Sequence, residues 1–337
     1  MVKIGMVLAS KRLLAVIIVV VVVVALASFT AGYYVGYNAG FTAVPKVMRI
    51  GYLMADIHHT PFFVAFSMGF YEDEGIVPKR LEYVNGPAQM IAFSAGDLDG
   101  GYVGVVPALM AKAKGVDLVI VASANLEGSA LVAKNEIKSL LELDGKVVGT
   151  PGIGTIQDCL LYMIEKKFNI TMVHQHYKVS DLPIALEKRE VDAYIAWEPF
   201  ATEAVIKGIG QIIYTSHDIM PSHQCCVFYV SGKIYREQPD LLRKMLKAHI
   251  RSVKFIIANG TDSMKIFSNA TGKPFEVVEK SWRNIIWDYR PNVESMKMFV
   301  EYLIKQGKIN ADDVPDIDKF IDAAFPADLR ELLEEMK

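Results

Sequence analysis

The chain has 337 residues, of which 52% are hydrophobic and 22% charged, and its formal net charge is −2. This length suits a short leading segment followed by two lobes of ordinary domain size, and the hydrophobic share excludes a wholly disordered chain. The slightly negative charge argues against a nucleic-acid-binding protein, which would carry a strongly basic surface.

The first feature along the chain is an apolar segment at residues 13–31, in which only Ser28 and Thr30 are polar. At about 1.5 Å per residue, a helix of this length spans roughly 28 Å, close to the hydrocarbon thickness of a bilayer. Lys11 and Arg12 precede the segment, so residues 1–12 are expected to stay in the cytoplasm. We therefore predict a single-pass transmembrane helix at 13–31 in the cell membrane, a spacer at 32–46, and a folded domain on the extracytoplasmic side.

A cleaved signal peptide is the alternative for this segment. Ala25-Leu26-Ala27 has the small-residue pattern of a signal-peptidase site, although the apolar run continues past it. No cysteine follows the run, which excludes a bacterial lipoprotein anchor. Both alternatives export the rest of the chain.

After the spacer, short strand-like runs alternate with helical patterns, which predicts an α/β fold with parallel sheets and right-handed crossovers. From residue 239 onward the pattern becomes almost wholly helical, and residues 326–337 are expected to form a C-terminal tail. Strands are expected at 47–52, 79–83, 98–103, 118–124, 130–133, 147–150, 174–178 and 193–196, with helices at 61–74, 87–95, 107–114, 156–167, 182–188, 241–259, 261–271, 275–287 and 293–306.

Two apolar runs, 129–133 and 226–230, enclose a self-contained α/β block of about a hundred residues. We interpret these runs as paired connections between two lobes. Lobe I would comprise residues 47–129 and 227–325, and lobe II residues 130–226.

Four predicted helices begin with a start signal directly after a strand or loop. The signals are Thr60-Pro61, Gly86-Pro87, Gly104 to Pro107, and Gly152 to Thr155, the last followed by Asp158 in a capping-box spacing. In open α/β sheets such helix starts face the ligand crevice, where free N–H groups attract anions. The glycines at 152 and 154 lack the lysine of a P-loop, so nucleotide hydrolysis is not supported.

Six segments, in order, resemble the nitrate/sulfonate/taurine group of ABC-transporter solute-binding proteins. They lie at 59–65, 69–76, 95–99, 114–118, 143–149 and 191–193, within a resemblance that covers about 47–325. The resemblance implies a two-lobed periplasmic-binding protein type II fold with a helical C-terminal portion. It also implies an importer in which the closed protein presents its solute to an ABC permease and ATPase.

The solute expected from this resemblance is a small oxoanion such as a sulfonate, nitrate or bicarbonate. The predicted cleft segments contain no lysine or arginine, so neutral donors and helix starts would hold it. Glu127 and Glu198 also lie in these segments, and they would suit a zwitterion, an aminated ligand or a metal–anion pair. The candidate ligand-binding residues, chosen at helix starts, at strand ends and beside the connections, are His58, His59, Thr60, Tyr102, Glu127, Ser129, Thr155, Gln157, Trp197, Glu198 and His223.

Two alternatives remain. One is a binding protein for a heteroaromatic, pyrimidine-type ligand stacked on Trp197 or Tyr102. The other is an enzyme resembling the thiamine-pyrimidine synthase group, whose multi-cysteine, iron-associated motif falls at residues 221–228. Here only Cys225 and Cys226 occupy that segment, and the histidine and lysine which that group uses after the strand at 98–103 are missing.

No reaction chemistry is expected from the remaining patterns. Cys159 stands alone and Cys225 adjoins Cys226, which is neither a disulfide framework nor a zinc-ligand spacing. No Ser-His-Asp arrangement or HExxH motif occurs. The sequence therefore predicts no catalytic residue, no metal ligand and no cofactor.

Overall fold

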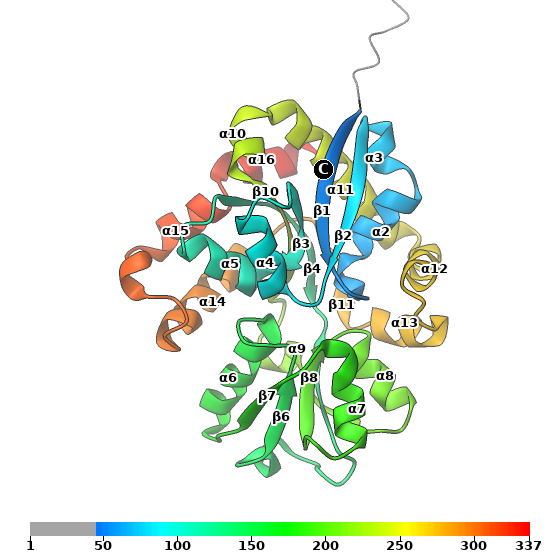
Figure 1. Cartoon of the computed structure of the whole chain (residues 1–337), viewed down its shortest axis with the longest axis vertical. Helices are drawn as coiled ribbons and strands as arrows, with labels where there is room; N and C mark the ends of the chain where they lie inside the picture. The colour runs from blue at the N-terminus through cyan, green and yellow to red at the C-terminus, as the bar shows by residue number, and fades with distance from the viewer. Residues whose placement is uncertain (1–44) are drawn as a thin grey trace, which may run out of the picture. The chain divides into compact units, whose positions relative to one another are not determined.

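The computed structural model describes residues 45–337, which contain two β-sheets with helices packed around each (Figure 1). The larger sheet has six strands in the order β11-β4-β10-β3-β1-β2. Its strands are β1 (Lys46–Leu53), β2 (Ile76–Tyr83), β3 (Gly100–Gly104), β4 (Leu118–Glu127), β10 (Gln224–Ser231) and β11 (Ile285–Ile286).

The smaller sheet has five strands in the order β7-β6-β8-β5-β9. Helices α6 to α9 surround it in the lower half of Figure 1. The strands are β5 (Ser129–Ala133), β6 (Val147–Thr150), β7 (Val173–His176), β8 (Ala193–Trp197) and β9 (Gln211–Thr215), and the helices are α6 (Ile156–Phe168), α7 (Leu182–Glu187), α8 (Phe200–Ile206) and α9 (Ser216–Ile219).

The remaining helices accompany the larger sheet or follow it in the chain. Helix α11 packs along α2 on one side of this sheet, and both contribute large apolar side chains to the core, among them Phe62 and Leu246. These helices are α2 (Thr60–Ser67), α3 (Phe70–Asp73), α4 (Gly86–Ser94), α5 (Val105–Ala113), α10 (Gly232–Glu237), α11 (Pro239–Ala258), α12 (Gly260–Thr271), α13 (Phe275–Trp282), α14 (Val293–Lys305), α15 (Ile317–Ala324) and α16 (Ala327–Glu335).

The prediction of parallel sheets is correct for part of each sheet only. Strand β1 runs parallel to β3, and β6 runs parallel to β7 and β8, as expected for strands joined by helical crossovers. However, β10 is antiparallel to β3 and β4, and β5 is antiparallel to β8 and β9. The short strand β11 is also antiparallel, to β4. Strands β5 and β10 each follow a connection between the two sheets, so no crossover helix sets their direction.

The chain passes between the sheets at two narrow connections. Strand β4 ends at Glu127 and β5 begins at Ser129, so Gly128 alone separates strands of different sheets. Its φ of 95° lies in the region that favours glycine. The return connection runs through residues 220–223, between α9 and β10.

Several predicted helices differ from those in the structure. The single helix expected at 61–74 is divided at Gly69, whose φ of 71° ends α2 before α3 begins. The helix expected at 275–287 ends at Trp282, after which β11 pairs with β4. Residues 326–337, expected as a tail, include α16, whose Leu329 and Leu333 are buried.

The predicted membrane segment at 13–31 lies outside the described residues, as do residues 1–12 and most of the spacer at 32–46. Within residues 45–337 no helix combines the length and the apolar character needed to cross a bilayer.

Candidate functional site

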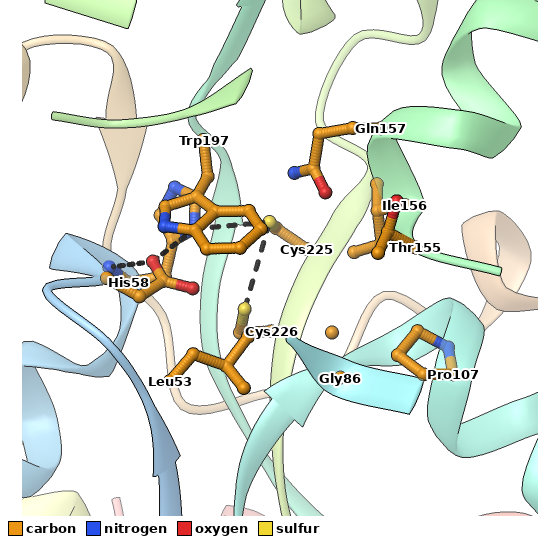
Figure 2. Close-up of a pocket in the computed structure, with 12 residues that line it drawn as sticks. Leu53, His58, Gly86, Pro107, Thr155, Ile156, Gln157, Trp197, Cys225 and Cys226 are labelled. Atoms are coloured by element: carbon orange, nitrogen blue, oxygen red, sulfur yellow. Dashed lines mark hydrogen bonds and ion pairs between the residues drawn. The ribbon is translucent and has the colours of Figure 1, made fainter. Parts of the chain in front are cut away.

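A small cavity lies where residues from both sheets and their helices meet (Figure 2). Its free volume for a water-sized guest is about 20 Å³. That space suits one water molecule or one ion rather than a larger solute. The lining residues are Leu53, Asp56, His58, Gly86, Gly104, Pro107, Thr155, Ile156, Gln157, Trp197, Cys225 and Cys226.

Three helices begin at this cavity. Gly86 begins α4, Gly104 is the N-cap of α5, and Thr155 is the N-cap of α6. Asn85 and Thr155 cap their own helices, but no side chain caps α5. The N–H groups at the start of α5 are therefore without a side-chain acceptor next to the cavity, where they favour negative charge.

Neutral polar side chains contribute further donors to the lining. The indole Nε1 of Trp197 is buried and has no hydrogen-bond partner among the described residues. Gln157 Nε2 donates to Ser129 Oγ at 2.9 Å, and Thr155 Oγ1 donates to the carbonyl of Gly152 at 2.8 Å. Trp197 Nε1 and the second hydrogen of Gln157 Nε2 are thus left as donors for a guest, since a buried N–H without an acceptor is costly.

The two glutamates of the predicted cleft direct their carboxylates elsewhere. Glu198 accepts hydrogen bonds from the backbone N–H and hydroxyl of Thr202 and from Asn284 Nδ2. Burial raises the pKa of Glu198, although these hydrogen bonds oppose that shift. Glu127 Oε1 lies 2.9 Å from His217 Nδ1 and accepts the backbone N–H of Ser222. Neither carboxylate lines the cavity, so neither opposes an anion there by direct contact.

One side of the cavity carries a cluster of Asp56, His58, Cys225 and Cys226, here called the thiol cluster. The Sγ atoms of Cys225 and Cys226 are 4.0 Å apart, and Cys225 Sγ lies 3.6 Å from His58 Nδ1. That same nitrogen lies 3.0 Å from Asp56 Oδ1. All four side chains are buried, with exposed fractions of 2% or less.

A β-bulge brings the two adjacent cysteines to one side of their strand. Successive residues of a regular strand point to opposite faces. In β10, however, Gln224 pairs with Leu126 while Cys226 pairs with Asn125, so Cys225 is an extra residue in the ladder. Figure 2 shows both sulfurs at the cavity between His58 on one side and Pro107 on the other.

The members of the thiol cluster shift one another's pKa values. Burial alone would raise the pKa of Cys225, but a hydrogen bond from Cys226 and the nearby His58 lower it well below its usual range. Burial opposes a charge on His58, yet Cys225 and Asp56 raise its pKa well above the ordinary value. Cys226 has a strongly raised pKa because of burial and its contact with Cys225. These directions favour a proton on His58 over one on Cys225, and they favour the neutral thiol of Cys226.

The structure places the predicted site residues in two groups. His58, Thr155, Gln157 and Trp197 line the cavity. The others lie outside the lining: His59, Thr60, Tyr102, Glu127, Ser129, Glu198 and His223.

Most residues of the second group serve the surrounding structure. Tyr102 is a core residue whose hydroxyl lies 3.0 Å from His249 Nδ1 and 3.2 Å from the hydroxyl of Tyr71. The hydroxyl of Thr60 donates to the carbonyl of Ile57, and His59 Nδ1 accepts the backbone N–H of Leu53. Tyr102, Thr60 and His59, which were predicted to contact the ligand, therefore do not line the cavity.

Sequence reasoning missed Asp56, Cys225 and Cys226 as lining residues. The adjacent cysteines were visible, but no basic residue flanks them in the sequence. Their partner His58 is 167 positions away, and the bulge that turns both thiols inward has no sequence signature. Asp56 gave a weak signal, since it lies two residues before a predicted site histidine.

Comparison with known proteins agrees with this architecture. Residues 42–266 match the family described as NMT1-like. The chain belongs to the NMT1-like family.

Two curated relatives are similar to this NMT1-like chain over most of its folded part. A protein of Brucella abortus named as a binding protein is 27% identical over 69% of this chain and 76% of its own length. An Escherichia coli protein named as an aliphatic sulfonates-binding protein is 26% identical over 58% of this chain and 61% of its own length. The predicted resemblance to the nitrate/sulfonate/taurine group is thereby confirmed.

A solved structure confirms the fold of this NMT1-like chain. The periplasmic nitrate-binding protein of Synechocystis PCC 6803 superimposes with a TM-score of 0.74, covering 87% of this chain and 89% of its own, at 16% identity. The predicted two-sheet periplasmic-binding protein fold is correct.

Proposed function

We propose that this chain is the extracytoplasmic solute-binding component of an ABC importer, which captures a small oxoanion between two lobes and delivers it to a permease. Lobe I would comprise residues 47–129 and 227–325, and lobe II residues 130–226. The relatives named for sulfonate and nitrate binding support this solute class.

The observation that carries the proposal is the convergence of neutral donors on one cavity. Trp197 Nε1 is buried without a partner among the described residues, and the uncapped start of α5 adjoins the same space. No lysine or arginine is among the described residues that line it. An anion held here would be bound by N–H dipoles, as at other helix starts.

The small volume supports a closed state of the two lobes. A solute of several atoms enters only if the lobes separate, and closure then surrounds it from both sides. The single-residue connection at Gly128 and the four-residue connection at 220–223 are short enough to act as hinges. A ligand that touches both lobes stabilises the closed form, which the permease and its ATPase would then recognise.

The proposal places the folded domain on the outer side of the cell membrane. The apolar segment at 13–31, preceded by Lys11 and Arg12, would serve as the single-pass anchor. If the chain is instead cleaved after Ala27, the folded domain still lies on the outer side of the membrane. Mass spectrometry of the mature chain distinguishes the two.

Thermal unfolding of the full chain in the presence of candidate solutes tests this function. A sulfonate, nitrate or bicarbonate at about 100 times its Kd should raise stability by about 2.7 kcal/mol, a shift of several degrees in Tm. The proposal fails if none of these anions changes Tm while a pyrimidine does, because that outcome supports the heteroaromatic alternative. Turnover of a pyrimidine precursor by the chain alone would support the enzyme alternative.

A pair of Trp197 variants separates the two binding alternatives. Trp197→Phe keeps an aromatic face but removes the Nε1–H donor, whereas Trp197→Ala removes both. An oxoanion bound by Nε1 loses its stabilising effect in both variants. A stacked heteroaromatic ligand should retain much of its effect in Trp197→Phe and lose it only in Trp197→Ala.

A further inference from the structure

The thiol cluster has the composition and spacing of a metal site. It combines two cysteine sulfurs, one imidazole nitrogen and one carboxylate, and all four side chains are buried beside the cavity. His58, Cys225 and Cys226 present ligand atoms that all lie within 4.8 Å of one another, and so do Asp56, His59 and Cys226. Buried polar groups of this kind are normally hydrogen-bonded to one another or bound to a metal.

The interatomic distances fit a tetrahedral ion. With Zn–S bonds of about 2.3 Å and Zn–N bonds of about 2.0 Å, tetrahedral ligands lie about 3.8 Å apart for two sulfurs and about 3.5 Å apart for sulfur and nitrogen. The two sulfurs are 4.0 Å apart, and Cys225 Sγ is 3.6 Å from His58 Nδ1. Both distances lie within a few tenths of an ångström of the tetrahedral values.

We propose that Asp56, His58, Cys225 and Cys226 bind one borderline-soft divalent cation of the zinc type at the side of the cavity. Asp56 Oδ1, 3.0 Å from His58 Nδ1, supplies the fourth ligand atom. Two thiolates with an imidazole select zinc-like ions over magnesium or calcium, which prefer oxygen ligands.

His59 acts as a positioning residue for this site. Its Nδ1 accepts the backbone N–H of Leu53 at 3.0 Å, so in the neutral ring the hydrogen is on Nε2. Nε2 is buried without a hydrogen-bond partner among the described residues and lies 3.8 Å from Asp56 Oδ2, just beyond hydrogen-bond distance. A small approach of the Asp56 carboxylate would let this N–H orient it, as outer partners do in other metal sites.

The plain alternatives account for the cluster less well. A disulfide between the neighbouring cysteines needs sulfurs about 2.05 Å apart, roughly half the separation seen here. A purely structural apolar cluster would not place an aspartate and a histidine next to both thiols. The cavity beside them offers about 20 Å³ to a water-sized guest, which gives an ion a place to enter.

With two thiolates and a carboxylate as ligands, the bound ion and its ligands would carry a formal net charge of about −1, and a tetrahedral ion would have no open position for a solute. The metal site therefore rests on its four side chains and not on the proposed function. The two ideas are therefore tested by separate readouts.

Cobalt(II) binding to the full chain, reduced and freed of metal by a chelator, tests the site. We expect one equivalent of Co²⁺ to give a thiolate-to-cobalt charge-transfer band and visible bands of tetrahedral cobalt, and Zn²⁺ to displace it. Cys225→Ser and Cys226→Ser should each lower the affinity by about 100-fold or more, because changes to outer partners alone already lower it about 10–100-fold.

Cys159→Ser is the matched control, since Cys159 is also a buried free cysteine but does not line the cavity. Asp56→Asn and His58→Gln are second variants, and circular dichroism establishes that each is folded. The proposal is overturned if stoichiometric Co²⁺ gives no thiolate band, or if the band survives with unchanged affinity in both Cys225→Ser and Cys226→Ser.

Thermal shifts with nitrate or a sulfonate, recorded with and without Zn²⁺, keep the two proposals apart. Anion stabilisation without any cobalt spectrum overturns the metal site and leaves the solute-binding function standing. A cobalt spectrum together with no change in Tm on addition of any anion supports the metal site and contradicts oxoanion binding.

Discussion

Lys273 Nζ lies 2.6 Å from Glu203 Oε2. This ion pair connects the segment after α12 to helix α8, which packs beside the five-stranded sheet. Both side chains are mostly buried, with about 17% and 16% of their surface exposed. The ammonium group also lies 4.1 Å from the centre of the Phe200 ring. These contacts join parts of the chain that the proposed function assigns to different lobes.

Lys273→Met should favour the open form. Loss of a partly buried ion pair costs about 1 kcal/mol, so solute affinity should fall about fivefold. Small-angle X-ray scattering of the unliganded protein should give a larger radius of gyration than for the unaltered chain. Lys265→Met is the matched control because, among residues 45–337, Lys265 pairs only with the exposed Asp262 in its own helix. Equal effects of the two variants would contradict a closing role for Lys273.

Gly128→Ala should destabilise the fold and displace His58. The φ of 95° is unfavourable for alanine, and an added Cβ would overlap His58 Nε2. We expect a loss of about 2–3 kcal/mol in the free energy of unfolding, measured with urea, because strain and overlap act together. Gly115→Ala is the control, since its φ is 82° but nothing lies within 4 Å of an added Cβ. It should cost only about 1 kcal/mol.

Thr155→Val should weaken both helix α6 and solute binding. Thr155 Oγ1 accepts the backbone N–H of Asp158 at the start of α6, and loss of an N-cap costs about 1 kcal/mol. Thr215→Val is a matched variant, because Thr215 caps α9 in the same way without lining the cavity. Both variants should be less stable in urea, and isothermal titration should show weaker solute binding only for Thr155→Val. Unchanged binding in Thr155→Val would remove this residue from the site.

His249 should make stability depend on pH. Burial lowers its pKa to about 4, against 6.5 for an exposed histidine. The ring contacts the hydroxyl of Tyr102 and the carbonyl of Ser123, neither of which carries a charge at neutral pH. The unfolded chain therefore binds a proton that the folded chain does not, and stability falls as pH drops from 6.5 toward 4.

The size of this effect is about 2 kcal/mol between pH 7 and pH 5. Urea unfolding at the two pH values should show a smaller difference for His249→Gln than for the unaltered chain. The difference should not vanish, because burial also lowers the pKa of His59 to about 4. An identical pH dependence in His249→Gln would show that His249 makes no such contribution.

Local patterns sufficed to place most elements along the chain. The strand at 147–150 matches β6 residue for residue, and the helix starts at Gly86, Gly104 and Thr155 do meet at one cavity. These signals are local, since alternation, proline and capping residues act within a few positions of the chain. The break at Gly69 shows where such local prediction fails. A glycine that ends a helix in the left-handed conformation has the same sequence signal as a glycine that is tolerated inside a helix.

The direction of β5 and β10 was decided only by the tertiary structure. Both strands follow a connection between sheets, and neighbours far along the chain determine how they pair. The same holds for Tyr102, whose place at the end of a strand suggested a ligand contact. Its hydroxyl instead meets Tyr71 and His249, and this buried contact depends on residues from α3 and α11.

The sequence by itself determined the fold class, the family and the helix starts, because these follow from short-range patterns and from ordered motifs. The tertiary structure alone decided which side chains share a site. Cys225 and Cys226 face one cavity because of a bulge, and they meet His58 and Asp56 because the short helix at Ile57–His59, capped by Asp56, packs against β10. Such proximity arises from packing over more than 160 positions of the chain, and no local pattern records it.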